Sequence, residues 1–152
     1  MTTPTDVTIR PLRASDVADW RRLWTDYLTF YHSSVSELVY ASTFARLLGD
    51  DPHDFYGLVA EQGNTLVGLV HYVFHRHCWR IENTCYLQDL YADPAVRGTG
   101  IGRQLIEAVY QAADQAGAPA VYWLTQDGNR QARQLYDRIG QVTNFVKYQR
   151  PA

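Results

Sequence analysis

Hydrophobic and polar residues follow two different spacings along this chain, and the changes of spacing divide it into elements. Spacings typical of amphipathic helices predict helices from Ser15 or Asp16 to about Phe30 and over 36–48, 100–116 and 129–140. Alternating or continuous apolar runs, with turn residues between them, predict strands over 7–10, 56–61, 65–75, 86–92, 120–125 and 142–149.

The order of these elements predicts the fold class. Antiparallel hairpins come first, and a strand–helix–strand unit follows over 86–125. This order predicts a mixed α/β (α+β) domain spanning 1–152, with a mostly antiparallel central sheet and helices on both faces. We expect the strands 86–92 and 120–125 to be parallel neighbours, and the strand 142–149 to close the sheet.

A glycine-rich turn lies between the strand 86–92 and the helix that starts near Gly100. The turn carries Arg97 and glycines at 98, 100 and 102, so main-chain N–H groups are uncovered at a helix N-terminus. Such groups bind phosphate, and an arginine adds a fixed cation. The turn lacks the Lys-Ser/Thr of a P-loop, and Arg103 stands where a dinucleotide fingerprint has glycine.

A second segment, Asn129–Gly140, is a short helix that Asn129 caps at its start and Gly140 ends. A capped amphipathic helix explains its apolar positions fully. It does not require Tyr136 seven residues after Asn129, two turns down the same face.

These two segments together resemble the GNAT superfamily of acetyl-CoA-dependent N-acetyltransferases, and the resemblance extends over nearly the whole chain. The branch it is most similar to contains diamine (polyamine), thialysine and small histone/polyamine acetyltransferases. The residues that carry this similarity are Trp20, Leu23, Tyr27, Phe30, Tyr31, 86–91 and 121–123. The resemblance implies that the two parallel strands splay apart and that the pantetheine arm of the cofactor enters the gap. It implies a cofactor site made of Leu90, Tyr91, Ala92, Arg97, Gly98, Thr99, Gly100, Ile101, Gly102, Arg103, Asn129 and Tyr136.

The same resemblance assigns catalytic roles to three residues. Tyr136 is the acid for the leaving thiolate, and the main-chain N–H of Leu90 is the oxyanion donor. Gln88 stands where close relatives carry the glutamate implicated in deprotonating the amine, and glutamine does not ionise. Three outcomes follow: Asp89, Glu82 or a histidine ends a water chain, the substrate has a lower amine pKa, or catalysis is weak. A structural carboxylate is the favoured interpretation of Asp89.

The expected acceptor is a primary amine, namely a small cation such as a polyamine or a lysine-like amino acid. Acidic and aromatic residues that suit a cation lie near the site in sequence, and Glu37, Asp50, Asp51 and Asp54 add to them. The alternatives are a protein lysine or N-terminal acetyltransferase and a CoA-binding regulatory module. The predicted substrate contacts are Tyr27, Trp79, Glu82, Tyr86 and Asp89.

Composition narrows the remaining classes. A net charge of −2 argues against nucleic acid as a partner. The absence of an apolar run of membrane length and the polar leader Met1–Asp6 indicate a cytoplasmic protein. Cys78 and Cys85 are expected to be free thiols, and the histidines near them form no metal site. Since few residues follow Gly140, we expect an open sheet edge and a homodimer.

Overall fold

The central sheet has five strands that lie in the order in which they occur along the chain, β1-β2-β3-β4-β5. The computed structural model that shows this describes residues 6–152, so all of the predicted polar leader except Asp6 lies outside the described residues. The first four strands are antiparallel neighbours and β5 runs parallel to β4, which confirms the predicted mixed sheet. The strands are β1 (Val7–Pro11), β2 (Tyr56–Gln62), β3 (Thr65–His75), β4 (Thr84–Ala92) and β5 (Val121–Tyr122).

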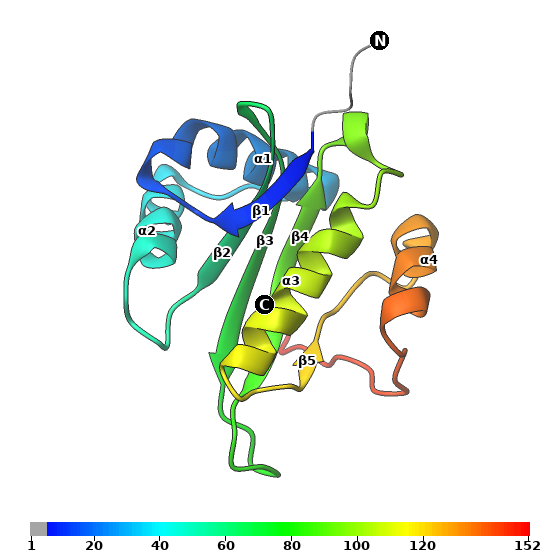
Figure 1. Cartoon of the computed structure of the whole chain (residues 1–152). Coiled ribbons are helices and arrows are strands. Elements are labelled where there is room, and N and C mark those ends of the chain that lie inside the picture. Colours follow the sequence, from blue (N-terminus) through cyan, green and yellow to red (C-terminus); the bar gives the residue numbers. More distant parts are fainter. Residues whose placement is uncertain (1–5) are drawn as a thin grey trace.

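Helices cover both faces of this sheet, as predicted (Figure 1). The first pair, α1 (Val17–Phe30) and α2 (Glu37–Leu48), packs on one face, and α3 (Ile101–Gln115) crosses the other (Figure 1). The last helix, α4 (Arg130–Ile139), packs against the same core as α3. Single turns of 3₁₀-helix, η1 (Ala14–Asp16) and η2 (Pro94–Val96), precede α1 and the glycine turn. Among residues 6–152, no helix combines the length and the apolar character that crossing a bilayer requires.

Each face of the sheet has its own hydrophobic core. The face under α1 and α2 is dominated by aromatic rings, with Trp20 stacked on Trp24 at a centroid distance of 5.2 Å. The face under α3 is aliphatic, and it is formed by residues of β2, β3, β4 and α3. The buried members of this second core are Ala60, Val67, Val70, Tyr72, Cys85, Leu87, Ile101, Leu105, Ile106, Val109 and Ala113.

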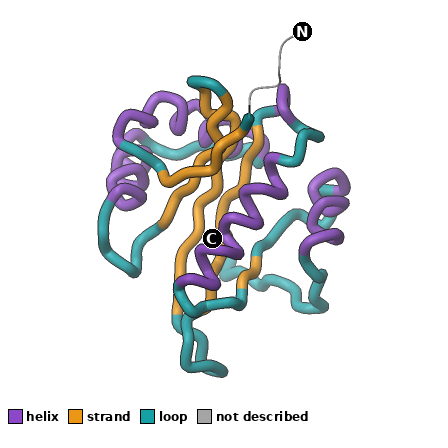
Figure 2. Tube along the Cα trace, in the orientation of Figure 1, coloured by secondary structure: helices purple, strands orange, loops and turns teal. Residues whose placement is uncertain are grey.

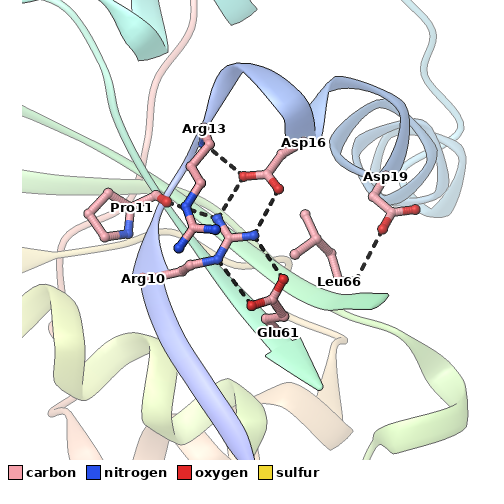
Figure 3. Close-up of polar contacts among 7 residues, drawn as sticks. All are labelled: Arg10, Pro11, Arg13, Asp16, Asp19, Glu61 and Leu66. Atoms are coloured by element: carbon pink, nitrogen blue, oxygen red, sulfur yellow. Dashed lines mark hydrogen bonds and ion pairs between the residues drawn. The ribbon is translucent and has the colours of Figure 1, made fainter. Parts of the chain in front are cut away.

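A buried ion cluster fixes the start of α1 to the edge of the sheet (Figure 3). Arg10 on β1 donates two hydrogen bonds of 2.8 Å to the carboxylate of Asp16, and it also pairs with Glu61 of β2 at 3.0 Å. Asp16 accepts a further bond of 2.7 Å from the main-chain N–H of Arg13. A bidentate arginine–carboxylate pair fixes orientation as well as distance. The direction in which α1 leaves the sheet is therefore set by Arg10.

Gly68 on β3 allows α3 to approach the sheet closely. A Cβ atom at this position would lie 3.1 Å from Ile101, from Leu105 and from the carbonyl oxygen of Tyr91. Those contacts are shorter than side chains normally tolerate, so only glycine leaves room for the first turn of α3. The N-terminus of α3, which carries the glycine turn, is thus positioned by the sheet itself.

A β-bulge interrupts the pairing of β3 with β4 at Gln88. His71 faces Asp89, but the next pair joins Tyr72 to Leu87, so Gln88 is the extra residue. A bulge changes which face the following side chains occupy. Leu87 and Leu90 consequently belong to the α3 face although they are three residues apart, while Tyr91 belongs to the α1 face.

Two predicted strands differ from the structure (Figure 2). The strand expected over 120–125 is reduced to Val121–Tyr122, because the chain turns away from β4 after its second paired residue. The prediction of a closing strand over 142–149 is wrong: within residues 6–152 this segment pairs with no strand and is exposed. Its apolar pattern has no neighbouring strand in the same chain to bind. Among its exposed residues are Val142, Phe145, Val146 and Tyr148.

The helix boundaries agree with the predicted ones to within one or two residues, but two predicted caps differ. Asp16 occupies the N-cap position of α1 without a side-chain capping bond, because its carboxylate binds Arg10 and Arg13 instead. Asn129 occupies the N-cap position of α4, and its side chain likewise makes no capping bond. Its amide Nδ2 donates to the Thr125 hydroxyl at 3.4 Å.

Candidate functional site

A cleft with a volume of about 540 Å³ lies where β4, the glycine turn and the helices α1 and α4 meet. It brings together three separate parts of the sequence, within 27–31, 90–103 and 129–138. A smaller recess, lined in part by Gln88, Trp123 and Leu124, opens beside it. The residues that line the large cleft include Tyr27, Tyr31, Leu90, Tyr91, Ala92, Arg97, Gly98, Gly100, Ile101, Gly102, Arg103, Asn129 and Tyr136.

The divergence of β5 from β4 opens this cleft. Within the described residues, β5 pairs with β4 only at Cys85 and Tyr86, whereas β4 continues to Ala92. The edge of β4 that carries Leu90 and Ala92 therefore faces the cleft rather than another strand. An unpaired strand edge offers main-chain donors and acceptors to an extended ligand. This arrangement agrees with the splayed strands that the sequence resemblance implies.

The glycine turn forms one end of the cleft. Gly98 and Gly100 have φ angles of 84° and 87°, a region that favours glycine, and a Cβ on either would meet open space. The first helical hydrogen bond of α3 runs from the N–H of Gln104 to the carbonyl of Gly100, at 3.0 Å. The N–H groups of the three preceding residues stand at the helix N-terminus, where the macrodipole favours an anion. This end of the cleft therefore fits a phosphate group.

Two residues of the turn serve its shape. The hydroxyl and the main-chain N–H of Thr99 both donate to the carbonyl oxygen of Val96, and Thr99 does not line the cleft. A Cβ on Gly102 would lie 3.3 Å from the Leu135 side chain, so this glycine lets α4 pack close to the first turn of α3. Both residues belong to the predicted cofactor set, and the structure gives each of them a local packing role.

Arg97 supplies the positive charge at the turn. Its Nε donates to the carbonyl oxygen of Ala92 at 3.2 Å, and its guanidinium carbon lies 5.4 Å from the centre of the Tyr91 ring. The side chain is exposed and lines the cleft. An arginine held this way keeps its remaining donors available to the cleft, because its guanidinium carries five N–H groups in a fixed plane. Arg103, one turn into α3, forms an ion pair with Glu107 at 2.8 Å.

Tyr136 lines the wall formed by α4 and lies at the junction of the cleft and its smaller recess. Burial raises the pKa of its phenol to about 12, and the nearby Tyr31 adds to this effect. Trp123 contacts it edge-on at a centroid distance of 5.5 Å. Gly140 makes room for that indole, since a Cβ there would lie 2.8 Å from Trp123. Tyr136 is therefore a protonated donor held in place by packing.

The predicted substrate contacts separate into two groups. Tyr27 lines the cleft, and Asp89 lies beneath it in a network with His71 and Trp24. Trp79 and Glu82 lie exposed in the loop between β3 and β4, outside the lining. Tyr86 is also outside the lining, and its ring stacks on Tyr122 at 4.8 Å.

The acidic neighbourhood expected from the sequence does not assemble around the cleft. Glu37 pairs with Arg21, and Asp54 lies 4.0 Å from Arg46. Asp51 accepts a bond from the main-chain N–H of its neighbour His53, and Asp50 is exposed. These carboxylates are solvated or paired on the α2 side, which is how loop charges are usually found.

Sequence reasoning missed several residues of the site. Tyr31 lines both the cleft and its recess, although the sequence indicated it only as one of the residues that carry the family resemblance. His71 belongs to the group of histidines near the cysteines, yet it is buried and touches Asp89. No local pattern could pair His71 with Asp89, because these two residues meet across the neighbouring strands β3 and β4. The thiols Cys78 and Cys85 are free, and burial raises the pKa of Cys85 to about 12.

Comparisons with known proteins agree with this geometry. Residues 17–141 match the model of the acetyltransferase (GNAT) family. The chain is 35% identical to a D-amino-acid N-acetyltransferase of Saccharomyces cerevisiae over 146 residues, covering 95% of this chain and 90% of that protein. It is 32% identical to the thialysine N-epsilon-acetyltransferase of Mus musculus, covering 87% and 82% of the two chains.

Solved structures show the same fold. An aminoglycoside N-acetyltransferase in complex with CoA superposes with a TM-score of 0.85 at 16% identity, covering 99% of this chain and 98% of that chain. The family match over most of the chain and two curated relatives above 30% identity, together with the cleft described above, lead to one conclusion. This chain is a member of the acetyltransferase (GNAT) family.

Proposed function

We propose that this protein transfers an acetyl group from acetyl-CoA to the amino group of a small molecule. The observation that carries the proposal is the cleft itself, which runs from the glycine turn along an unpaired strand edge to the half-buried Tyr136. When bound, acetyl-CoA supplies an acetyl thioester and a thiol leaving group. In this proposal Arg97 and the N–H groups at the start of α3 hold its diphosphate.

The residues at the far end of the cleft suit acyl transfer. Tyr136 keeps its proton at neutral pH because burial raises its pKa to about 12, so it is a donor for a leaving thiolate. Leu90 lines both the cleft and the recess, and we assign its main-chain N–H to the acyl oxygen. The bulge at Gln88 supports this assignment, since a bulge disrupts the ladder of main-chain hydrogen bonds.

We further propose that the acceptor is an amino acid rather than a polyamine. A polyamine carries several positive charges, and the acidic side chains expected to bind them are paired or solvated away from the cleft. Asp89 lies beneath the cleft, where its charge acts on Tyr27, a residue of the lining. One negative charge beneath the cleft suits one amino group. The curated relatives named above are a D-amino-acid and a thialysine acetyltransferase, which supports the same class.

A thiol-release assay with acetyl-CoA tests both parts of the proposal. The panel contains L- and D-amino acids, thialysine, spermidine and a lysine-containing peptide. Release of CoA with amino acids is the expected result. Turnover with the peptide alone indicates a protein-modifying enzyme instead, and turnover with spermidine alone refutes the choice of acceptor. CoA binding without turnover on any amine indicates a regulatory module, which the loss of an ionisable group at Gln88 would explain.

Tyr136→Phe tests the acid. Removing the hydroxyl leaves the ring and its contact with Trp123 in place, so we expect the fold and CoA binding to be retained. We expect kcat to fall about 100-fold or more, the usual effect of losing a general acid. Unchanged turnover in Tyr136→Phe would remove Tyr136 from this role.

We also propose a homodimer formed through the C-terminal segment. Phe145, Val146 and Tyr148 are exposed although their pattern is typical of a strand, and the outer edge of the short β5 is open within the described residues. A second copy of the chain offers both a complementary segment and a complementary edge. Light scattering after size exclusion should give twice the chain mass, and Phe145→Asp should shift it towards the monomer. A monomeric wild-type protein at micromolar concentration refutes this proposal.

A further inference from the structure

A chain of hydrogen bonds runs from the core under α1 to the wall of the cleft. The indole N–H of Trp20 donates to His71 Nε2 at 2.9 Å, and His71 Nδ1 lies 2.8 Å from Asp89 Oδ2. The indole N–H of Trp24 donates to the same carboxylate oxygen at 3.2 Å. Trp20, Trp24 and His71 are all buried, and the side chain of Asp89 is 13% exposed. The carboxylate is thus held from below by two donors.

The first bond in this chain fixes the tautomer of His71. An indole nitrogen is a donor only, so the Nε2 that receives its bond carries a lone pair and no proton. The single proton of the neutral ring therefore sits on Nδ1, where it is donated to Asp89. A proton added at Nε2 would face the N–H of Trp20. His71 consequently orients Asp89, and its second nitrogen is occupied by the indole of Trp20.

Tyr27 lies at the end of this series of side chains that is nearest to the cleft. Trp20, Trp24 and Tyr27 follow one another at spacings of four and three residues, which places them on one face of α1. Tyr27 lines both the cleft and its recess, and its phenol lies beside Asp89, within reach of that charge. Burial, and to a smaller extent the charge of Asp89, raises the pKa of the phenol, so Tyr27 keeps its proton and faces the carboxylate as a donor. The lone pairs of its oxygen remain available to the cleft.

We propose that Tyr27 and Asp89 together accept the proton that the amine must lose, a role that Gln88 does not perform. This inference rests on the acetyltransferase function proposed above. The step begins with the neutral amine, one N–H of which is accepted by the Tyr27 oxygen. As the nitrogen bonds to the acyl carbon, its proton passes to Tyr27 while the Tyr27 proton passes to Asp89. The new N–C bond replaces the C–S bond, whose electron pair leaves with the sulfur, and Asp89 then returns its proton to water.

The geometry favours this pair over the alternatives that the sequence left open. Glu82 lies in the exposed loop between β3 and β4. His71 is blocked at its second nitrogen by Trp20. Tyr86 also lies within the field of Asp89, which together with burial raises its pKa, but its ring stacks on Tyr122 outside the cleft. Tyr27 is the phenol that combines contact with Asp89 and a place in the lining.

Steady-state kinetics on four variants test the inference: Asp89→Asn, Tyr27→Phe, the double variant and His71→Gln. We expect each of the first two to lower kcat about 100-fold, in the range for losing a general base, with CoA affinity unchanged by calorimetry. Because the two residues act as one unit, the double variant should be no slower than either single variant. His71→Gln, a positioning variant, should lower kcat less than Asp89→Asn and leave the KM for acetyl-CoA unchanged. Asp114→Asn and Tyr56→Phe, two substitutions outside the cleft lining, are the matched controls.

Several outcomes overturn the inference. Full activity in Tyr27→Phe or Asp89→Asn would do so, and so would a double variant whose loss is the product of the two single losses. A loss in Tyr86→Phe that Tyr27→Phe does not show would assign the role to the other phenol. If wild-type protein acetylates no amine, the proposed function fails and these comparisons do not arise.

A measurement on the wild-type protein keeps the test independent of whether the variants fold. Nitrogen-15 NMR of labelled histidine distinguishes the two neutral tautomers of the ring. The inference expects His71 with its proton on Nδ1, and it expects Trp20→Phe to release that preference. A wild-type ring with its proton on Nε2 refutes the hydrogen-bond chain that holds Asp89, whatever the activity is.

Discussion

The buried pair of Arg10 and Asp16 gives the sharpest prediction for the stability of this protein. In Asp16→Asn the side chain keeps its shape but loses its charge and replaces one acceptor oxygen by an NH₂ group. That group must face a donor, because Arg10 approaches both carboxylate oxygens and Arg13 also binds Oδ2. The substitution therefore leaves part of the Arg10 guanidinium buried without its counter-ion.

The magnitude follows from burial and from the partners that remain. The side chains of Arg10 and Asp16 are 9% and 8% exposed, and breaking a pair this buried costs about 3–5 kcal/mol. Arg10 keeps Glu61 at 3.0 Å and the carbonyl of Pro11 at 3.1 Å, so we expect the lower end, about 3 kcal/mol. For a chain of this size the midpoint of thermal unfolding should fall by about 6–12 °C. Glu61→Gln is the control, because Glu61 is more exposed and its loss should cost much less than the loss of Asp16.

The pH dependence of the difference in stability between the wild type and Asp16→Asn provides the second readout. Its hydrogen bonds with Arg10, opposed in part by burial, lower the pKa of Asp16 below that of an unfolded aspartate. The stabilisation is thus fully present above the unfolded pKa, about 3.9, and is lost as pH falls through the lower folded pKa. Urea unfolding of the wild type and of Asp16→Asn should show that the difference in their free energies of unfolding at pH 7 shrinks below about pH 4. A deficit under about 1 kcal/mol at pH 7, or one that stays constant on acidification, would refute this reasoning.

Two further substitutions test how the cofactor end of the cleft is built. Arg97→Ala should raise the KM for acetyl-CoA about 10- to 100-fold, the equivalent of one to two charge-assisted hydrogen bonds, and leave kcat nearly unchanged. A fall in kcat alone would contradict the anchoring role. Arg46→Ala on α2 is the control. Gly68→Ala should destabilise the fold by about 1–3 kcal/mol in urea unfolding, because its Cβ meets Ile101, Leu105 and the Tyr91 carbonyl at 3.1 Å. Gly49→Ala, whose Cβ makes ordinary contacts of 3.5 Å, should be nearly neutral, and equal effects at both glycines would contradict the packing argument.

The elements that a local pattern determines were predictable from the sequence. Helix α3 lies within one residue of its predicted bounds at each end, because its apolar stripe and the glycines around it are read within a few turns. Helix α1 also follows its predicted range, and its Trp20, Leu23 and Trp24 are buried. The conformation of the glycine turn was also predictable, since it depends on glycines that are close together in sequence.

Features that depend on distant pairing were not predictable. The bulge at Gln88 shifts the pairing of β3 with β4 by one residue, so that apolar side chains face the two cores both before and after it. Strand alternation alone does not indicate where such a shift occurs. The predicted closing strand over 142–149 has the composition of a strand but no neighbour within the described chain. The contact between His71 and Asp89 joins residues 18 positions apart that neither motif includes.

The bulge also explains how one cleft can offer one wall to the cofactor and another wall to the amine. Before it, β4 directs Cys85 and Leu87 to the α3 face; after it, Leu90 packs on that face while Asp89 and Tyr91 contact residues of α1. The wall that fits the cofactor is therefore built on the α3 side, and the side chains assigned to the amine come from α1 and the opposite face of β4. Each wall packs in its own core. We therefore expect substitutions under α1 to change the acceptor while leaving the glycine turn in place.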